Sequence, residues 1–220
     1  MKLKKVDFDE YADDYDSLLG KQLNFFSEDV DYYARYKVDL VAELLGADVI
    51  ERPLRILEFG CGTGSTALVH ASHVKHYLAV DVSDKMIEIA EHKLADTKID
   101  NLEFKISSIE DLNASHASFD AVLGLNILHL LDDPKASIKQ AFNVLKSDGV
   151  FVTSSPSLTG WMRLFQPIWP IGVFLGFIPK IQFFSHANLA KYMKEAGFDI
   201  EKHWIPEESK RTSFIIARKP

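Results

Sequence analysis

Apolar runs and amphipathic stretches alternate along the chain between residues 54 and 153. The apolar runs predict buried strands, at residues 56–59, 77–80, 102–106, 119–125 and 150–153. The stretches between them carry apolar residues at helical spacing and predict helices, at Thr66–Ser72, at Ser83–Ala95 and from Pro134 to Leu145. Strict alternation of strand and helix is typical of an α/β domain with a parallel sheet, doubly wound by its crossover helices.

The two ends of the chain follow other patterns. Residues 7–46 place tyrosine and leucine at helical spacing and end at Gly46, so residues 1–50 are expected to form an N-terminal helical segment. Residues 164–178 are almost wholly apolar but are broken by two prolines and two glycines, and a membrane span needs about 20 apolar residues. A capped helix at 185–197 and a hairpin of strands at 198–204 and 212–218 would complete one domain, residues 1–220.

Three glycines follow the first predicted strand directly, at Gly60, Gly62 and Gly64. Glycine accepts a positive φ and allows a ligand to approach where a Cβ would collide. The N–H groups at the start of the following helix would face that ligand. The turn therefore predicts a ligand site at the carboxyl end of the strand, and a glycine-rich connection without a ligand is the alternative.

Asp81 ends the second predicted strand, 17 residues after Gly64. A doubly wound fold places a ribose-binding carboxylate at about this distance. The alternative role, capping the next helix, is already filled by Ser83 and Asp84. We therefore interpret Asp81 as an acceptor of hydrogen bonds from two vicinal ribose hydroxyls.

The spacing of the glycines distinguishes between classes of nucleotide site. Gly60, Gly62 and Gly64 read G-x-G-x-G, whereas a dinucleotide fingerprint reads G-x-G-x-x-G, and Ser65 stands at its sixth position. The stretch instead resembles motif I of the class I S-adenosylmethionine-dependent methyltransferases, in which an acidic residue, here Glu58, precedes the turn. Three further stretches are similar to this family, at residues 8–16 (F-x-x-x-A-x-x-Y-D), 119–134 (F-D-x-V and L-H-x-L-x-D-P) and 145–149 (L-K-x-x-G).

The chain thus resembles the small-molecule methyltransferases of type 11, which are similar to quinone methyltransferases. This resemblance implies a seven-stranded sheet of order 3-2-1-4-5-7-6 with strand 7 antiparallel, and S-adenosylmethionine as the cofactor. It also implies the cofactor-binding residues, which are Tyr15, Glu58, Gly60, Cys61, Gly62, Gly64, Asp81, Val82, Met86, Ser108, Ile109, Gly124 and Leu125. Ser107-Ser108-Ile109 stands where the family has G-D-A, so the usual acid near the adenine is absent.

Composition narrows the range of partners. The 220 residues are 47% hydrophobic and carry a formal net charge of −7, and no long cluster of lysine and arginine provides a basic face, so nucleic acid is not expected as a partner. Cys61 is the single cysteine, which excludes an intrachain disulfide, and the histidines show no metal-binding spacing. No apolar leader follows the N-terminus, so we expect a cytoplasmic protein, a monomer or a homodimer, without a metal.

Methyl transfer depends more on the position of the acceptor relative to the methyl group than on reactive side chains, because the sulfonium methyl is already activated. Where the acceptor must lose a proton, His129 after the fourth strand is the candidate base, and a structural role for this histidine is the alternative. In the resembled family, the segment at residues 156–184 is inserted to cover the substrate. Its aromatic residues predict a small lipophilic acceptor and at most transient contact with a membrane surface, and a buried helical pair in the core is the alternative.

Two other function classes stay open at this point. One is a nicotinamide-dependent oxidoreductase, which the missing sixth-position glycine disfavours. The other is a methyltransferase-like module that binds the cofactor or a partner chain and transfers no methyl group. The resembled family has no single obligatory catalytic residue, so the sequence does not separate this module from an enzyme.

Overall fold

The structure is a computed structural model, and it describes residues 54–112, 118–156, 185–205 and 212–220. The predicted N-terminal helical segment, with Tyr15, lies outside the described residues. Almost all of the predicted substrate-covering insertion, residues 157–184, lies outside them as well. The predictions for these two segments therefore stay predictions.

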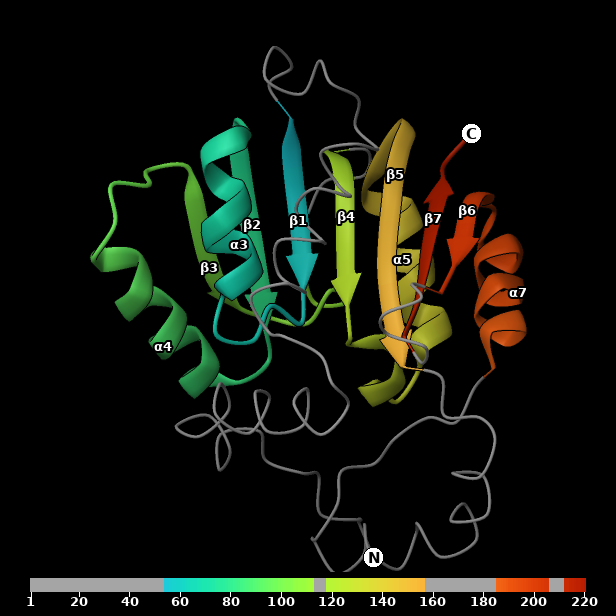
Figure 1. Cartoon of the computed structure of the whole chain (residues 1–220), viewed down its shortest axis with the longest axis horizontal. Coiled ribbons are helices and arrows are strands. Elements are labelled where there is room, and N and C mark those ends of the chain that lie inside the picture. Colours follow the sequence, from blue (N-terminus) through green and yellow to red (C-terminus); the bar gives the residue numbers. More distant parts are fainter. Residues whose placement is uncertain (1–53, 113–117, 157–184, 206–211) are drawn as a thin grey trace, which may run out of the picture.

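A single seven-stranded sheet forms the centre of the described part of the chain, with the order β3-β2-β1-β4-β5-β7-β6 (Figure 1). Its strands are β1 (Arg55–Phe59), β2 (His76–Asp81), β3 (Leu102–Ile106), β4 (Phe119–Leu125), β5 (Leu145–Pro156), β6 (Asp199–Trp204) and β7 (Thr212–Arg218). Strands β1 to β5 run parallel, and β7 runs antiparallel to both β5 and β6. The predicted fold class, strand order and C-terminal hairpin are confirmed.

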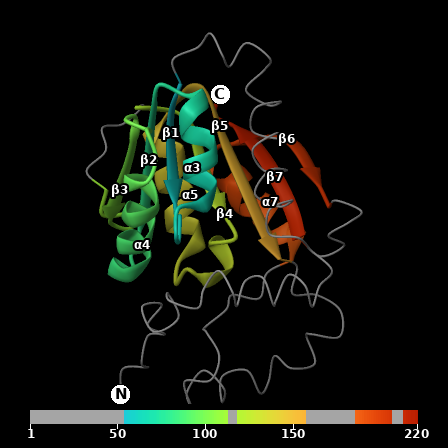
Figure 2. The ribbon, with the colours of Figure 1, turned by 60° about the vertical axis from the view of Figure 1, so that its left-hand side comes forward.

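Helices cover both faces of the sheet. Helices α3 (Ser65–His70) and α4 (Asp84–Ala95) bury alanine and isoleucine against one face, together with Ile56 and Leu123 of the strands. Helices α5 (Pro134–Val144) and α7 (His186–Ala196) pack on the other face, against Phe151 and Ile215. Figure 2 shows α3 in front of the sheet, with α5 behind it. No helix in the described part of the chain is long and apolar enough to cross a bilayer.

The predicted start of α5 and both predicted ends of α7 agree with the caps that the structure shows. Asp133 caps α5 and accepts hydrogen bonds from the N–H groups of Lys135 and Ala136, with proline at the first turn. Ser185 caps α7 in the same way, through the N–H of Asn188. Helix α7 ends at Gly197, whose φ of 106° places it in the left-handed region that glycine tolerates.

Two predicted boundaries were wrong. The first crossover helix begins at Ser65 and ends at His70, and residues Ala71–His73 continue as a tighter 3₁₀ turn. Strand β5 begins at Leu145 and not at Val150, because a register shift places Phe119 beside Leu145 and Ala121 beside Val150. Residues 145–149, read from the sequence as a turn before the strand, therefore form an irregular start of the strand, with Asp148 at a φ of 61°.

Candidate active site

The glycine turn adopts the backbone conformation that its composition predicts. Gly60, Gly62 and Gly64 have φ values of 67°, 54° and 75°, all in the left-handed region. Two of them are also required by packing. A Cβ on Gly60 would lie 2.4 Å from the Cγ1 of Ile127, and a Cβ on Gly64 would lie 2.5 Å from the Cζ of Phe104. The turn therefore packs closely against Phe104, in the middle of β3, and against Ile127, two residues after β4, and it follows β1 at the carboxyl edge of the sheet.

Asp81 joins this turn to the end of β2. One oxygen of its carboxylate accepts a hydrogen bond from the N–H of Gly62 at 2.9 Å, and the other accepts from the N–H of Ser83 at 3.0 Å. The cap of α4 is Ser83, whose hydroxyl accepts from the N–H of Met86 at 3.2 Å, as the sequence analysis assumed. These two bonds orient the carboxylate of Asp81 at the end of β2.

Two residues next to these glycines, Glu58 at the end of β1 and Cys61 in the turn, lie in the interior. The Glu58 side chain is 2% exposed, and its Oε2 accepts a 2.8 Å hydrogen bond from the hydroxyl of Tyr77. Burial and the neighbouring Glu58 raise the pKa of Tyr77 well above its usual value, so the phenol stays protonated as the donor. Burial, with Glu58 and Asp81 nearby, also raises the pKa of the Cys61 thiol. Cys61 therefore stays a thiol, which makes it a poor nucleophile.

The ends of β2 and β3 present apolar side chains to solvent beside Asp81. Val82 is 52% exposed and Ile106 is 53% exposed, and Ile106 is the strand partner of Asp81. Such half-exposed aliphatic groups suit the faces of a flat aromatic ring. Val82 was predicted at the cofactor. Ile106 was missed, because its place beside Asp81 depends on the register of β2 and β3.

The loop after β3 departs from what the sequence suggested for the adenine. The Ser108 hydroxyl donates to the Asp111 carboxylate at 2.8 Å and accepts from the Asp111 N–H at 3.1 Å. A carboxylate is therefore present near the position where the usual family acid is absent, three residues later in the chain. The Ile109 side chain is 2% exposed and packs in the core, which leaves its backbone for the predicted adenine contact.

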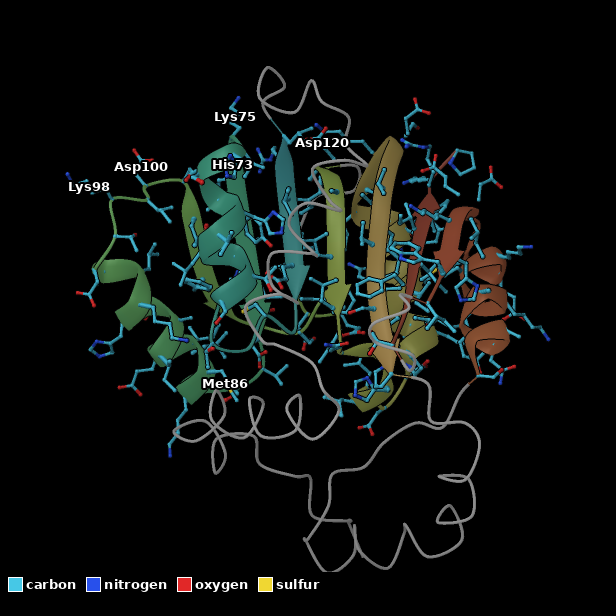
Figure 3. The ribbon with its side chains drawn as sticks, viewed as in Figure 1. His73, Lys75, Met86, Lys98, Asp100 and Asp120 are labelled. Carbon is cyan, nitrogen blue, oxygen red and sulfur yellow. The ribbon has the colours of Figure 1, made fainter. Side chains whose placement is uncertain are left out.

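Met86 lies in the first turn of α4 and is 2% exposed. Figure 3 shows it at the end of the sheet where β1, β2 and β4 terminate, opposite the end that holds His73, Lys75 and Asp120. The predicted cofactor residues on β1, β2 and α4 are thus brought to one edge of the sheet.

Gly124 and Leu125, predicted at the methionine end, close strand β4. A Cβ on Gly124 would lie 2.6 Å from the Cζ of Phe59, so the packing of aromatic rings already accounts for this glycine. The next residue, Asn126, was missed by the sequence analysis. Its φ is 55°, and its N–H donates to the carbonyl of Ser154 at 2.9 Å. A non-glycine residue in the left-handed region is uncommon, and such residues often mark functional positions.

His129 follows in a short 3₁₀ turn, Leu128–Leu130, just beyond β4. Its side chain is 9% exposed, and its Nδ1 has no hydrogen-bond partner in the described part of the chain. Burial lowers the pKa of His129 from 6.5 to about 4. The imidazole is therefore neutral near pH 7, and its Nδ1 or Nε2 can accept a hydrogen bond.

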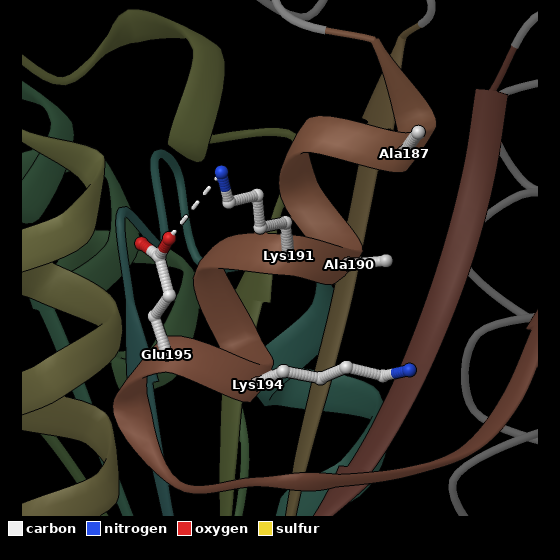
Figure 4. A pocket seen from close by; sticks show the side chains of 5 residues that line it. All are labelled: Ala187, Ala190, Lys191, Lys194 and Glu195. Carbon is white, nitrogen blue, oxygen red and sulfur yellow. Dashed lines mark ion pairs between the residues drawn. The ribbon is translucent and has the colours of Figure 1, made fainter.

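A concave feature lies on the outer surface of α7, away from the glycine turn. It is lined by Ala187, Ala190, Lys191, Lys194 and Glu195 (Figure 4), where Lys191 and Glu195 form an exposed ion pair at 3.7 Å. All of its lining residues come from one helix, and an exposed ion pair of this kind contributes little to the stability of the fold. We assign it no ligand. Among the described residues, no group of histidine, cysteine, aspartate and glutamate side chains could hold a metal ion.

Comparison with known proteins places the chain in a family. A family model described as a methyltransferase domain matches residues 26–203. The chain therefore belongs to the methyltransferase-domain family. The recognised resemblance, the class of enzyme and S-adenosylmethionine as the cofactor of that class are confirmed at the level of the family. Membership does not favour the alternative of a nicotinamide-dependent oxidoreductase.

The relatives are distant. A Bacillus subtilis protein named uncharacterized methyltransferase YcgJ is 28% identical over 131 residues, which cover 58% of this chain and 52% of that protein. The ubiquinone biosynthesis O-methyltransferase of Neisseria meningitidis serogroup C is 29% identical over 161 residues, 68% of this chain and 65% of the relative. The chain thus spans between half and two thirds of the length of these relatives.

One solved structure shows that proteins with this fold do not all have the same reaction. The [4+2]-cyclase SpnF aligns with a TM-score of 0.63 at 19% identity, over 81% of each chain. A protein with this fold is therefore named for a reaction other than methyl transfer. The reaction of the present chain has to be argued from its site.

Proposed function

We propose that this chain transfers the methyl group of S-adenosylmethionine to a small lipophilic acceptor. The observation that carries the proposal is the hydrogen bond from the Gly62 N–H to the Asp81 carboxylate, 2.9 Å long, at the carboxyl edge of the sheet. This bond holds a left-handed glycine turn and an oriented carboxylate side by side, next to the point where the strand order reverses between β1 and β4. Ligands of open α/β sheets bind at such a point.

The residues present fit this cofactor. The three left-handed glycines place no Cβ on the turn, and the Asp81 carboxylate can accept hydrogen bonds from two ribose hydroxyls. Val82 and Ile106 offer apolar surface for the adenine ring. When bound, S-adenosylmethionine supplies a methyl group on a positively charged sulfur, which is already activated toward a nucleophile.

The contribution of the protein is then placement of the acceptor in line with the methyl group. Holding two reactants in a near-attack geometry can supply several kcal/mol of the barrier. Exclusion of water by apolar surroundings also helps, because positive charge on the sulfur disappears as the reaction proceeds. His129, buried and neutral, can accept a hydrogen bond from the attacking group and orient it. A group with a pKa of about 4 is a weak base. We therefore propose that His129 orients the attacking group and does not remove its proton.

Two observations support a lipophilic acceptor. Residues 157–184 contain tryptophan and phenylalanine at Trp161, Phe165, Trp169, Phe174 and Phe177, in a segment that the sequence places between the fifth strand and α7. Several of the relatives are named ubiquinone biosynthesis O-methyltransferases. Both favour an acceptor with a large apolar part over an amine or a nucleic acid, although the apolar segment would have the same composition as part of the core.

Calorimetric titration with S-adenosylmethionine, S-adenosylhomocysteine and NAD tests the cofactor. We expect the first two to bind and NAD not to bind. A screen of hydrophobic and polar acceptors, read by release of S-adenosylhomocysteine, then tests the acceptor. Turnover on polar amines or nucleic acid alone would contradict the lipophilic acceptor, and cofactor binding without any turnover would favour the non-catalytic module.

Polar substitution of Trp169 and Phe174 separates a substrate cover from a core element. Loss of activity with unchanged cofactor affinity and melting temperature would support the cover. Loss of folding would support the core.

A further inference from the structure

Asn126 is held in an uncommon backbone conformation directly after β4. The strand ends at Leu125, and the φ of Asn126, 55°, lies in the left-handed region. The N–H of Asn126 donates to the main-chain carbonyl of Ser154 at 2.9 Å and also to the Ser154 hydroxyl oxygen at 3.2 Å. These bonds to β5 hold the residue in a conformation that asparagine tolerates better than most residues do.

The same serine orients the side-chain amide of Asn126. Ser154 is 0% exposed, and its hydroxyl donates to the Oδ1 of Asn126 at 3.1 Å. The amide oxygen therefore faces Ser154, and the NH₂ group points away from it. Asn126 itself is half-buried, and within the described part of the chain its Nδ2 has no hydrogen-bond partner and is not a buried atom. The NH₂ group is thus an oriented donor that a ligand can reach.

The order of the strands places this amide beside the glycine turn. Strand β4 is the neighbour of β1, and the side chain of Ile127 lies where a Cβ of Gly60 would be. Asp81, the proposed ribose ligand, ends β2, and the adenine lies toward β3. The amino-acid part of the cofactor then extends the other way, across β1 to β4. Two strand spacings are about 10 Å, which the chain between the ribose and the carboxylate can span with one hydrogen bond at its end.

Three N–H groups of the glycine turn are already engaged within the protein. The N–H of Cys61 donates to the carbonyl of Val80 at 3.1 Å, and that of Gly62 donates to the Asp81 carboxylate at 2.9 Å. The N–H of Gly64 donates to the carbonyl of Cys61 at 3.1 Å. A carboxylate beside the turn therefore needs a donor from a neighbouring element.

We propose that the NH₂ group of Asn126 donates a hydrogen bond to the α-carboxylate of S-adenosylmethionine. This inference rests on the proposed function and deepens it, because it assigns a residue to the amino-acid end of the cofactor. A carboxylate only accepts hydrogen bonds and an NH₂ group only donates them, so the two groups are complementary. Asp81 at the ribose and Asn126 at the carboxylate hold the sulfur between them, which fixes the direction of its methyl group.

Calorimetric titration of the full chain with two ligands tests the proposal. The ligands are S-adenosylhomocysteine and S-adenosyl-3-thiopropylamine, which differ only in the α-carboxylate. In Asn126→Asp, one oxygen can still accept from Ser154, and the left-handed conformation is tolerated, but the other oxygen would repel a carboxylate. We expect the Kd for S-adenosylhomocysteine to rise about tenfold or more in this variant. The Kd for S-adenosyl-3-thiopropylamine should not rise.

A second variant and a control separate the amide from the shape of the turn. Asn126→Gly removes the amide from a backbone conformation that glycine adopts readily. It should weaken binding of S-adenosylhomocysteine about tenfold and leave the Kd for S-adenosyl-3-thiopropylamine within about twofold of the parent. Asn143→Asp is the matched control, because it makes the same change of charge in the last turn of α5. It should leave both Kd values within about twofold of the parent.

The ratio of the two Kd values decides the outcome. If this ratio is the same in Asn126→Asp as in the parent, Asn126 acts only through the shape of the turn and the proposal is wrong. Failure of the proposed function gives a different result. If the parent binds neither S-adenosylmethionine nor S-adenosylhomocysteine, the interpretation of the glycine turn is wrong, and this inference is wrong with it. If the parent binds both but the variants leave the ratio unchanged, only the role of Asn126 is overturned.

Discussion

Replacing Asp81 by alanine perturbs two sets of hydrogen bonds at once. The structure shows the first set, in which the carboxylate accepts from the N–H groups of Gly62 and Ser83 at 2.9 and 3.0 Å. The proposed second set joins the same carboxylate to the ribose of the cofactor. Hydrogen bonds to a charged group contribute about 1.5–3 kcal/mol, and each 1.4 kcal/mol is a factor of ten. We therefore expect the Kd for S-adenosylhomocysteine to rise about 10- to 150-fold in Asp81→Ala.

Isothermal titration calorimetry measures this change in Kd. Denaturant unfolding of the same variant measures the stability lost with the two hydrogen bonds from the N–H groups of Gly62 and Ser83. That loss should lower the free energy of unfolding by about 1–3 kcal/mol, and titration below the melting range keeps the protein folded. Asp84→Ala is the matched control, because Asp84 is an exposed carboxylate three residues after Asp81, in the first turn of α4. Its Kd should stay within twofold of the parent. If Asp81→Ala also binds within twofold of the parent, Asp81 does not bind the ribose.

Three further changes test other parts of the account. Gly64→Ala should lower the free energy of unfolding by about 2 kcal/mol or more, measured by urea melts, because φ is 75° and the new Cβ would lie 2.5 Å from the Phe104 ring; unchanged stability would mean that the turn relaxes freely. Tyr77→Phe removes the hydroxyl that donates to Glu58 at 2.8 Å and should cost about 1–3 kcal/mol by the same assay, whereas a neutral effect would show that other groups satisfy Glu58. The pKa of His129 is lowered from 6.5 to about 4 in the folded state, so the unfolded chain binds the proton first as pH falls. Stability should therefore decrease from pH 6.5 to about 4, by up to about 3 kcal/mol from this group, and His129→Gln should remove that part of the pH dependence; an unchanged slope would show that His129 titrates normally.

The order of the strands was implied by the family resemblance. The positions of most strands could be predicted because they are short apolar runs with helix patterns between them. The start of β5 could not, because residues 145–149 combine lysine, serine, aspartate and glycine as a turn would. Their place in the strand depends on the register shift between Phe119 and Ala121 on β4, a contact between distant parts of the chain. Similarly, the periodicity of apolar residues does not predict that α3 ends at His70 and that residues Ala71–His73 continue as a 3₁₀ turn.

The candidate site was predictable where its residues follow one another along the chain. The glycine turn and Asp81 have spacings that point to their roles, and the structure brings them within a hydrogen bond of each other. Ile106 carries no such signal, because it gains its place beside Asp81 only from the register of β3 on β2.

Asn126 is a different kind of omission. Its identity gives a weak signal, since asparagine tolerates the left-handed region better than most residues. Its φ of 55° and its bonds to Ser154 are visible only in the folded chain. Positions of this kind become candidates once the carboxyl edge of the sheet has been located.

A crystal structure of the full chain with S-adenosylhomocysteine tests the central claim most directly. The account predicts both ribose hydroxyls within about 3 Å of the Asp81 carboxylate, and the adenine against Val82 and Ile106. The amino-acid part of the ligand should lie along the glycine turn toward Gly124. A ligand bound elsewhere, or a ribose that makes no contact with Asp81, would contradict the proposed site.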